Sequence, residues 1–366
     1  MRIVIAFLIL FSNLYLRGAF PVLALILSSL LVSLALLQRP FMLRQIFSWI
    51  MPVILLFSLA YLRAWHNGAI SVASALISIV QLWLIFMVIL FCKIKYFDMI
   101  FAGLIYIGFM LVLGTIHFDA DLGNNRILEL INIDISRMNS VLLGNFAYSS
   151  LFFGIMCGSS FITKRYLLTI IYLILLFLLD SRTAILALPL SLYFSTYAHG
   201  KFGYFVGLFI LPLLMFYLSL EYGDLNLLSY RNLIWAAVVN SYDPSLFNSL
   251  FGYGYLGHFS SGVSRAYNFY FLDRGLYQSL VMSPHNSLIQ AVLDYGWLGF
   301  MYLLFKISRL SSRVPNNKLL LFSLMYMTVN SGFEIVFVPP NMISMIVLGL
   351  MLNEWYSRKV EHVPLC

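Results

Sequence analysis

Long apolar runs recur along the chain and are separated by short polar breaks. Most of these runs approach the roughly 20 residues that a helix needs to cross the hydrocarbon core of a bilayer. They are continuous and lack the apolar-polar alternation of membrane-barrel strands. The pattern therefore predicts an all-α polytopic integral membrane protein with about 12 transmembrane helices. The predicted spans are 3–16, 19–37, 45–62, 70–92, 97–116, 139–158, 166–179, 183–199, 202–220, 286–305, 318–335 and 339–356.

Composition agrees with this class. Of the 366 residues, 62% are hydrophobic and 10% are charged, and the mean hydropathy is +0.93. A chain of this composition is not a soluble globular protein. No internal repeat or low-complexity linker divides it, so we expect one transmembrane domain over 1–366. The three cysteines form no paired framework, and no Cys/His spacing is typical of a zinc site.

The basic residues predict the orientation. Of the 22 lysines and arginines, fourteen fall at the N-terminus, in the even-numbered loops and in the C-terminal tail, and this group includes every lysine. Eight arginines fall in the odd-numbered loops. The excess predicts that both termini are cytoplasmic and that the odd loops face outward. The net charge of +8 is spread over the loops, so it indicates membrane orientation and no nucleic-acid partner.

Two outward loops are long enough to carry a function, at 117–138 and 221–284. The second, between the ninth and tenth spans, is too long for a simple connection and is expected to form a compact lid. An apolar stripe from Leu225 to Trp235 is expected to lie as a helix on the membrane surface. The lid tyrosines offer flat surfaces that stack on sugars or, alternatively, anchor at headgroup depth: Tyr253, Tyr255, Tyr267, Tyr270 and Tyr277.

The segment Ser283-Pro284-His285-Asn286-Ser287 has the residue types of a helix start, with serine as the cap and proline just inside. This interpretation places His285 in the first turn of the tenth span, at the membrane surface. The positive end of the helix dipole disfavours the charged imidazolium, so the ring stays neutral and can accept a proton. His285 is therefore a candidate catalytic base. The alternative is an interfacial histidine without a chemical role.

Arginines in outward loops oppose the positive-inside bias, so each needs a reason to be there. Arg182 follows Ser181 in a tight outward turn, and Arg231 lies in the lid. Two guanidinium groups at headgroup depth can bind a diphosphate, because each binds phosphate oxygens in bidentate fashion. The alternative is a pair of structural salt bridges. Four further polar residues are expected to contact substrate: Ser181, Asn286, Arg265 and Arg274.

A divalent metal could serve the same electrostatic purpose. Asp119 and Asp121 form the only such acid pair in an outward loop, and two acids in a flexible loop are more often solvated than bound to metal. We therefore expect no metal and no cofactor, with arginines stabilising the departing diphosphate instead.

One further pattern joins these residues: His285-Asn286, then nine residues, then Gly296-Trp297-Leu298-Gly299, preceded by a long outward loop and by the turn Ser181-Arg182-Thr183-Ala184. In this pattern the chain resembles the O-antigen polymerase and O-antigen ligase superfamily, from about Ser181 to Phe300. The resemblance implies a multi-pass protein of the bacterial inner membrane that is active on its periplasmic face. It implies a glycosyltransferase whose donor is an oligosaccharide on undecaprenyl diphosphate, and as further partners membrane lipids and a chain-length regulator protein.

Carried over by motif, His285 resembles the base that activates the acceptor hydroxyl, and Arg182 and Arg231 resemble the arginines that hold the diphosphate. We expect a polymerase that joins repeat units for O-antigen, capsule or another surface polysaccharide. Two alternatives stay open. A ligase would transfer the glycan to lipid A core, and a lipid-linked oligosaccharide flippase would use the outward arginines along a transport path.

Overall fold

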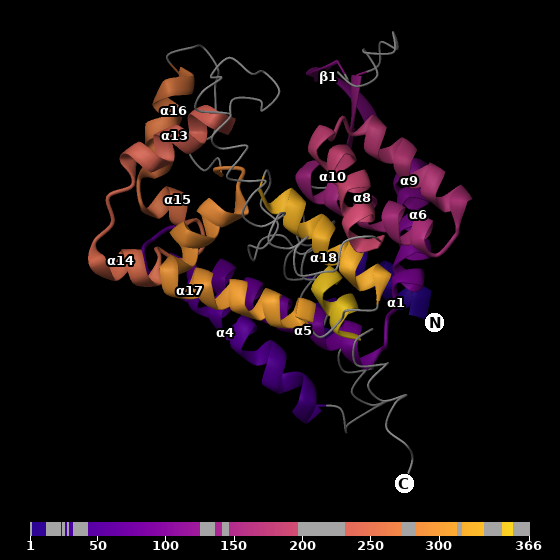
Figure 1. Cartoon of the computed structure of the whole chain (residues 1–366), viewed down its shortest axis with the longest axis horizontal. Coiled ribbons are helices and arrows are strands. Elements are labelled where there is room, and N and C mark those ends of the chain that lie inside the picture. Colours follow the sequence, from indigo (N-terminus) through magenta and orange to yellow (C-terminus); the bar gives the residue numbers. More distant parts are fainter. Residues whose placement is uncertain are drawn as a thin grey trace.

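The computed structural model describes residues 2–11, 23, 26, 27, 29–31, 43–124, 136–140, 146–196, 231–272, 283–312, 317–332 and 346–353. These residues are mainly helical (Figure 1). Their helices are α1 (Arg2–Leu10), α4 (Leu43–His66), α5 (Val72–Phe91), α6 (Tyr96–Val112), α8 (Phe146–Ile162), α9 (Tyr166–Leu178), α10 (Arg182–Thr196), α13 (Arg231–Ser241), α14 (Leu246–Phe251), α15 (Gly257–Ser260), α16 (Val263–Leu272), α17 (Ser287–Ser312) and α18 (Lys318–Ser331).

Nine predicted spans correspond to named helices within the described residues, namely α1, α4, α5, α6, α8, α9, α10, α17 and α18. Two helical segments, Val72–Leu90 and Ser287–Lys306, are long and apolar enough to cross a membrane. The apolar parts of α4, α6, α8 and α9 are shorter. The predicted span 202–220 lies outside the described residues, as do most of 19–37 and the first part of 339–356.

The expectation of an all-α chain is wrong at one place. Strand β1 (Ile116–Asn124) pairs with strand β2 (Ser136–Ser140) in an antiparallel two-stranded sheet, with Ile116 opposite Ser140. Helix α6 ends at Val112, and Gly114 turns the chain with a φ of 63°, a conformation that glycine adopts without strain. The first long outward loop is therefore partly a hairpin, and Asp119 and Asp121 lie in a strand rather than in a flexible loop.

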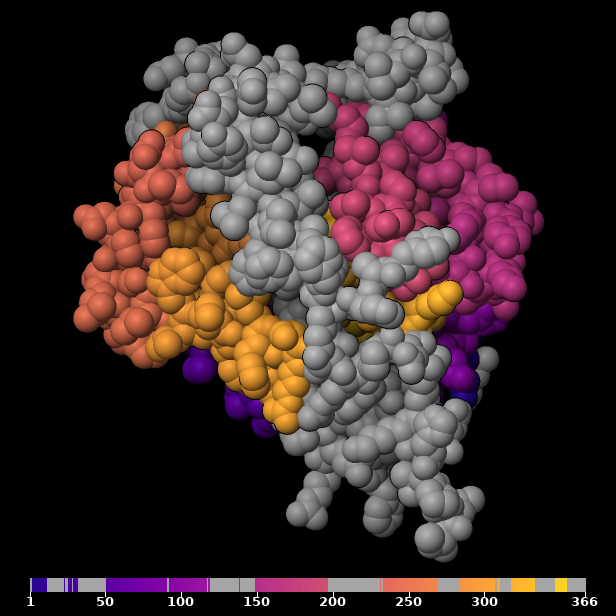
Figure 2. Space-filling model, viewed as in Figure 1, coloured from indigo at the N-terminus to yellow at the C-terminus, as the bar shows by residue number. Residues whose placement is uncertain are grey.

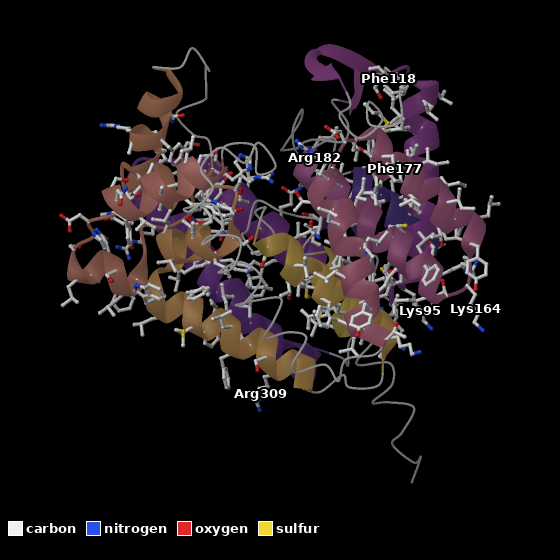
Figure 3. All side chains as sticks on the ribbon, turned by 45° about the horizontal axis from the view of Figure 1, so that its top comes forward. Lys95, Phe118, Lys164, Phe177, Arg182 and Arg309 are labelled. Carbon is white, nitrogen blue, oxygen red and sulfur yellow. The ribbon has the colours of Figure 1, made fainter. Side chains whose placement is uncertain are left out.

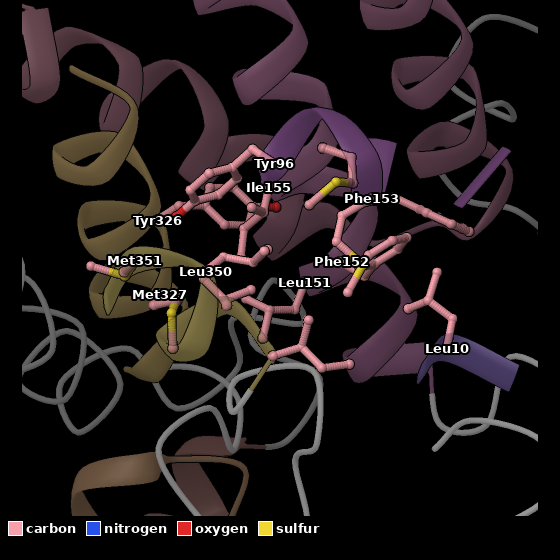
Figure 4. Packing of buried hydrophobic residues seen from close by; sticks show 14 of the residues in the cluster. Leu10, Tyr96, Leu151, Phe152, Phe153, Ile155, Tyr326, Met327, Leu350 and Met351 are labelled. Carbon is pink, nitrogen blue, oxygen red and sulfur yellow. The ribbon is translucent and has the colours of Figure 1, made fainter. Parts of the chain in front are cut away.

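The main core joins α8, α9, α10 and α18 with α1 and α6 (Figure 4). Small residues allow close helix approach here, as is common between membrane helices. The ring of Tyr326 lies directly over Gly154, and its hydroxyl donates a hydrogen bond of 3.0 Å to Ala184 O at the start of α10. The Tyr172 hydroxyl donates to Ile100 O at 2.6 Å. Buried tyrosines thus tie α9 to α6 and α18 to α10.

Large apolar side chains also cover much of the outer surface. On α9, Leu167, Ile170 and Ile174 are exposed on one helical face, while Tyr172 and Leu176 are buried on the other. Helix α17 exposes Leu298 and Met301. Exposed apolar faces on several helices would be unfavourable in water and are favourable against lipid hydrocarbon. With the two long apolar helices, they indicate a membrane protein.

Three basic residues, Lys95, Lys164 and Arg309, lie toward one side of the molecule and Arg182 lies toward the other. Figure 3 shows Lys95, Lys164 and Arg309 in the lower part of the view, and Phe118, Phe177 and Arg182 in the upper part. Lys95 precedes α6, Lys164 lies between α8 and α9, and Arg309 is in the last turns of α17. Which of these two sides faces the cytoplasm stays a prediction.

The described lid residues include the short helices α13 to α16, on the left of Figure 1. The first of these was expected to lie on a membrane surface, which is wrong for its described part. Trp235 and Ile234 are buried in a second core with Val263, Tyr267 and Leu293, which binds α13 to α16 and α17.

Tyr267 is 1% exposed, so it is a core residue and neither stacks on sugar nor anchors at headgroups. The burial also raises the pKa of its hydroxyl. Residues Leu225 to Leu228 and Tyr277, and the side chain of Tyr270, lie outside the described part of the chain.

The separation of the two ends gives a testable topology. In a background with the native cysteines replaced by alanine, Ser261→Cys, in the turn after α15, should react with a membrane-impermeant maleimide in intact cells. Lys164→Cys, at the opposite end, should react only after lysis. The opposite labelling pattern, read by gel shift, would reverse the orientation and place Arg182 in the cytoplasm.

Candidate functional site

The beginning of α10 places Arg182. Asp180, buried and with a φ of 51°, turns the chain out of α9. Ser181 then precedes the helix, and its carbonyl accepts the first intrahelical hydrogen bond, from Ile185 N at 3.0 Å. Arg182 is the first residue of α10, so its guanidinium extends from a helix N-terminus whose leading N–H groups have no intrahelical partner.

The beginning of α13 contacts both other parts of the predicted site. The first residue, Arg231, brings its Nη1 to 3.5 Å from the hydroxyl of Thr183, the neighbour of Arg182. One turn later Trp235, 0% exposed, donates from Nε1 to Pro284 O at 2.9 Å. Pro284 is the neighbour of His285. One short helix of the lid thus links the two sequence motifs.

His285 lies just outside α17, so its predicted place in the first helical turn is wrong. The helix begins at Ser287, and His285 has a φ of 49°. The cap is Asn286, whose Oδ1 accepts from Leu288 N at 2.9 Å and Ile289 N at 3.1 Å. Asparagine is among the best N-caps because its short side chain reaches the free N–H groups.

Asn286 has a second contact that fixes its orientation. Its Nδ2 donates to Gly332 O, at the end of α18, at 3.0 Å. The cap therefore ties the start of α17 to the end of α18, and α18 in turn holds the start of α10 through Tyr326 and Ala184. Asn286 is 6% exposed, which makes it a supporting residue of the site rather than an open substrate contact.

These contacts connect the beginnings of three helices, α10, α13 and α17, through side chains of α13. Each N-terminus carries a partial positive charge of about half an elementary charge. Arg182 and Arg231 stand at two of the termini, and His285 stands two residues before the third. Such an arrangement favours an anion between the helices.

The remaining predicted substrate contacts have different outcomes. Ser181 occupies the cap position of α10, next to Arg182. Arg265 is exposed on α16. Arg274 lies outside the described residues. The described part of the chain contains no cluster of three or more histidine, cysteine or acidic side chains that could hold a metal ion.

Sequence reasoning missed how the lid binds to α17. The helix is broken at Gly296, which has a φ of 68° and a ψ of −179°. The segment after α14 fills the break: Tyr253 N donates to Leu293 O at 2.7 Å, and Gly254 N donates to Asp294 O at 2.9 Å. Gly252 and Gly296 meet backbone to backbone, with no room for a Cβ on either.

A buried carboxylate completes this junction. Asp294 Oδ1 accepts from Gly257 N at 2.8 Å and from Gln290 Nε2 at 2.6 Å. In the sequence, Gly252-Tyr253-Gly254 and Gly296-Trp297-Leu298-Gly299 are two separate glycine motifs. The positive φ angles of Gly252, Gly254 and Gly296 and the contact between Gly252 and Gly296 show that the two motifs pair, and such a pairing is the signal that could have indicated the junction.

No family model, no curated protein and no solved structure matches the chain.

The glycine junction generates a prediction. Gly296→Ala and Gly252→Ala should each destabilise the protein by about 3 kcal/mol, because the added Cβ meets backbone atoms that cannot move aside and the φ is strained. The measurement is the midpoint temperature at which the purified protein loses monodispersity in detergent.

Two glycines serve as matched controls. Gly68→Ala adds a Cβ at a similar φ of +71° but in open space, so it reports the backbone strain alone. Gly108→Ala, inside α6 and also in open space, should leave the midpoint unchanged or slightly raised. A Gly296→Ala protein as stable as Gly108→Ala would show that the lid does not pack into the break.

Proposed function

We propose that the protein is a polysaccharide polymerase that joins undecaprenyl-diphosphate-linked oligosaccharide units at the periplasmic face of the bacterial inner membrane, for O-antigen, capsule or another surface polysaccharide. The observation that carries this proposal is the link made by α13, with Arg231 next to Thr183 and Trp235 bound to Pro284. The link reaches the neighbours of Arg182 and His285, and we propose that the residues singled out from these three segments surround one site.

The membrane setting supports a lipid-linked substrate. Arg182 lies at the end of the molecule opposite Lys95, Lys164 and Arg309 (Figure 3), which in the proposed orientation is the outer surface. We propose the twelve-span arrangement with both termini in the cytoplasm. A diphosphate at headgroup depth would then be level with the N-termini of α10, α13 and α17, while its polyprenyl chain extends into the bilayer.

In the proposed reaction the acceptor hydroxyl oxygen attacks the anomeric carbon of the donor sugar. The bond from that carbon to the diphosphate breaks, and the diphosphate leaves with the bonding electrons. His285 takes the hydroxyl proton as general base. Arg182 and Arg231, with the helix N-termini, stabilise the charge that develops on the departing diphosphate. A single displacement of this kind inverts the anomeric centre.

The position of His285 suits a base. Asn286 accepts the hydrogen bonds of the first-turn N–H groups, so His285, which lies outside the helix, is not needed as the helix cap. A residue with positive φ is strained unless its surroundings hold it, and such residues concentrate at functional sites. Here the neighbours Pro284 and Asn286 are both held by buried hydrogen bonds.

Replacing the base gives the test of the proposed function. His285→Ala should leave an inserted protein whose transfer rate falls roughly 10²- to 10⁴-fold. His66→Ala is the control, because His66 is also a histidine at the lid end of a helix but is exposed and outside the site. The readout is the glycan ladder of cells that carry each variant as the only copy.

The ladder also separates the alternatives. An inactive polymerase leaves lipid A core with a single repeat, or for a capsule single units on their outer lipid carrier. An inactive ligase leaves bare core with long chains on undecaprenyl diphosphate, and an inactive flippase leaves single units on the cytoplasmic side. We expect the first pattern. Normal chain length in the His285→Ala strain would remove the histidine from the mechanism.

The diphosphate clamp has its own prediction. Arg182→Lys and Arg231→Lys keep the charge but lose the planar fork, so each should lower activity about tenfold or more, the loss of one charge-assisted hydrogen bond. Arg165→Lys is the control, since Arg165 stacks on Phe97 at 3.9 Å at the opposite end of the molecule. Full activity in both site variants, at normal expression, would contradict the clamp, whereas a salt-bridge role predicts lower protein yield instead.

A further inference from the structure

A groove of about 580 Å³ lies between α4, α14 and α17, away from the site described above. Figure 2 shows α14 and α17 side by side on this flank of the molecule, with α4 beneath. The volume is in the range of small-molecule sites, about 300–1,000 Å³. Most of its wall is apolar, and the lining residues are Leu56, Leu59, Ala60, Leu62, Arg63, Phe247, Phe251, Asp294, Tyr295, Leu298, Gly299 and Tyr302.

The groove runs along α4 and α17, from a charged end at the lid to a deeper apolar end. Helices α4 and α17 run past each other in opposite senses, with the rings of Phe57 and Tyr295 5.7 Å apart and Leu56 against Gly299. Arg63 lies at the lid end, where its neighbouring turn is held by Asn67 Nδ2 donating to Tyr253 O at 2.7 Å. Seven residues earlier on α4, about 10 Å deeper, the groove is lined by Leu56.

Arg63 supplies the positive charge of the groove. Its Nη2 donates to Asn248 Oδ1 at 2.6 Å, its Nη1 lies 3.4 Å from Phe251 O, and its guanidinium stacks on Phe247 at 4.7 Å. All of these partners are neutral, so within the described residues no carboxylate neutralises the charge. The acidic residue of the lining, Asp294, accepts hydrogen bonds at Oδ1 from Gly257 N in the lid and from Gln290 Nε2 on α17.

The groove opens sideways through exposed apolar residues. Leu59 is 61% exposed, Leu298 is 53% exposed and Phe247 is 62% exposed. In a bilayer these side chains face hydrocarbon, so an apolar chain can enter from the lipid without crossing water. A cation at the outer end of an apolar groove is complementary to a lipid with an anionic phosphate head.

We propose that this groove binds the polyprenyl diphosphate of the acceptor, the second lipid-linked substrate, with its phosphates on Arg63 and its chain along α4 and α17. The inference rests on the proposed polymerase function, because that reaction must hold two lipid-linked saccharides at once. The donor diphosphate belongs at the reacting carbon, beside His285, Arg182 and Arg231. The groove beside Arg63 is then a separate anion site, which we assign to the acceptor.

The spacing favours the acceptor over the donor. Asp294 lines the groove together with Arg63, and Asn286 is the neighbour of His285. Along α17 these two residues are eight positions apart, or about 12 Å. A diphosphate at Arg63 is thus too far from His285 to be the leaving group. It is placed so that an oligosaccharide repeat can span from its lipid to the hydroxyl that His285 activates.

Photo-crosslinking on the full-length protein in lipid nanodiscs tests the proposal without any turnover. p-Benzoylphenylalanine in place of Leu298 should form an adduct with radiolabelled undecaprenyl diphosphate. The matched control position is Ile170 on α9, which is 53% exposed like Leu298 but does not line this groove. We expect at least tenfold more adduct at Leu298, resistant to an excess of phosphatidylglycerol.

The charge is tested in the same assay. Arg63→Gln should lower the adduct about ten- to a hundredfold, the effect of losing a hydrogen bond to a charged group, and Arg63→Lys should restore part of it. Arg165→Gln and His285→Ala should crosslink like the parent protein. Because the His285→Ala protein is inactive under the proposed function yet should still bind, a failure of the groove is distinguishable from a failure of the proposed chemistry.

Other outcomes would overturn the proposal. Equal adducts at Leu298 and Ile170 would mean general lipid contact. Displacement by phosphatidylglycerol would mean a phospholipid groove, and crosslinking of Leu298 to a second copy of the chain would mean a dimer interface. Loss of the adduct in Arg182→Gln but not in Arg63→Gln would assign the lipid to the donor.

Discussion

The structure depends on the way the lid satisfies a broken helix. In an uninterrupted α17, Leu293 O and Asp294 O would accept hydrogen bonds from residues four positions later, but the turn at Gly296 removes them from the ladder. Unpaired carbonyls cost several kcal/mol each in an apolar setting. Tyr253 N and Gly254 N replace the missing donors. The lid is therefore bound by its backbone, and the break and the lid require each other.

This junction determines where the candidate site lies. The lid is fixed to α17 below the helix start by Gly252, Gly254 and Gly257, and above it by Trp235 on Pro284. With both attachments in place, α13 cannot shift along α17, so its first residue, Arg231, meets Thr183 on α10. The arginines are thus positioned by helix termini and buried hydrogen bonds rather than by a loose loop.

The sequence predicted those parts of the fold that composition and charge control directly. Hydropathy alone marks the nine apolar runs that form named helices within the described residues, and Arg182 was singled out because an outward arginine opposes the positive-inside bias. The N-cap of α17 was predicted at Ser283, three residues before its actual position at Asn286. Ser283-Pro284 and Asn286 both fit the rules for an N-cap, and the contact of Asn286 with Gly332, far along the chain, distinguishes them. The burial of Trp235 and Tyr267, the hairpin of β1 and β2, and the groove beside Arg63 likewise depend on partners that no local pattern reveals.

Fixed and mobile charges have different parts in the proposed site. The three helix N-termini together supply about one and a half positive charges that cannot move, since each terminus carries roughly half a charge. Such preorganised dipoles cost no reorganisation when charge develops on a leaving group. The electrostatic effect of these dipoles decreases within one helical turn, however, and the dipoles cannot move with a diphosphate as its bond to the sugar lengthens. The side chains of Arg182 and Arg231 can follow it, which is why the proposed clamp needs both arginines beside termini that already favour an anion.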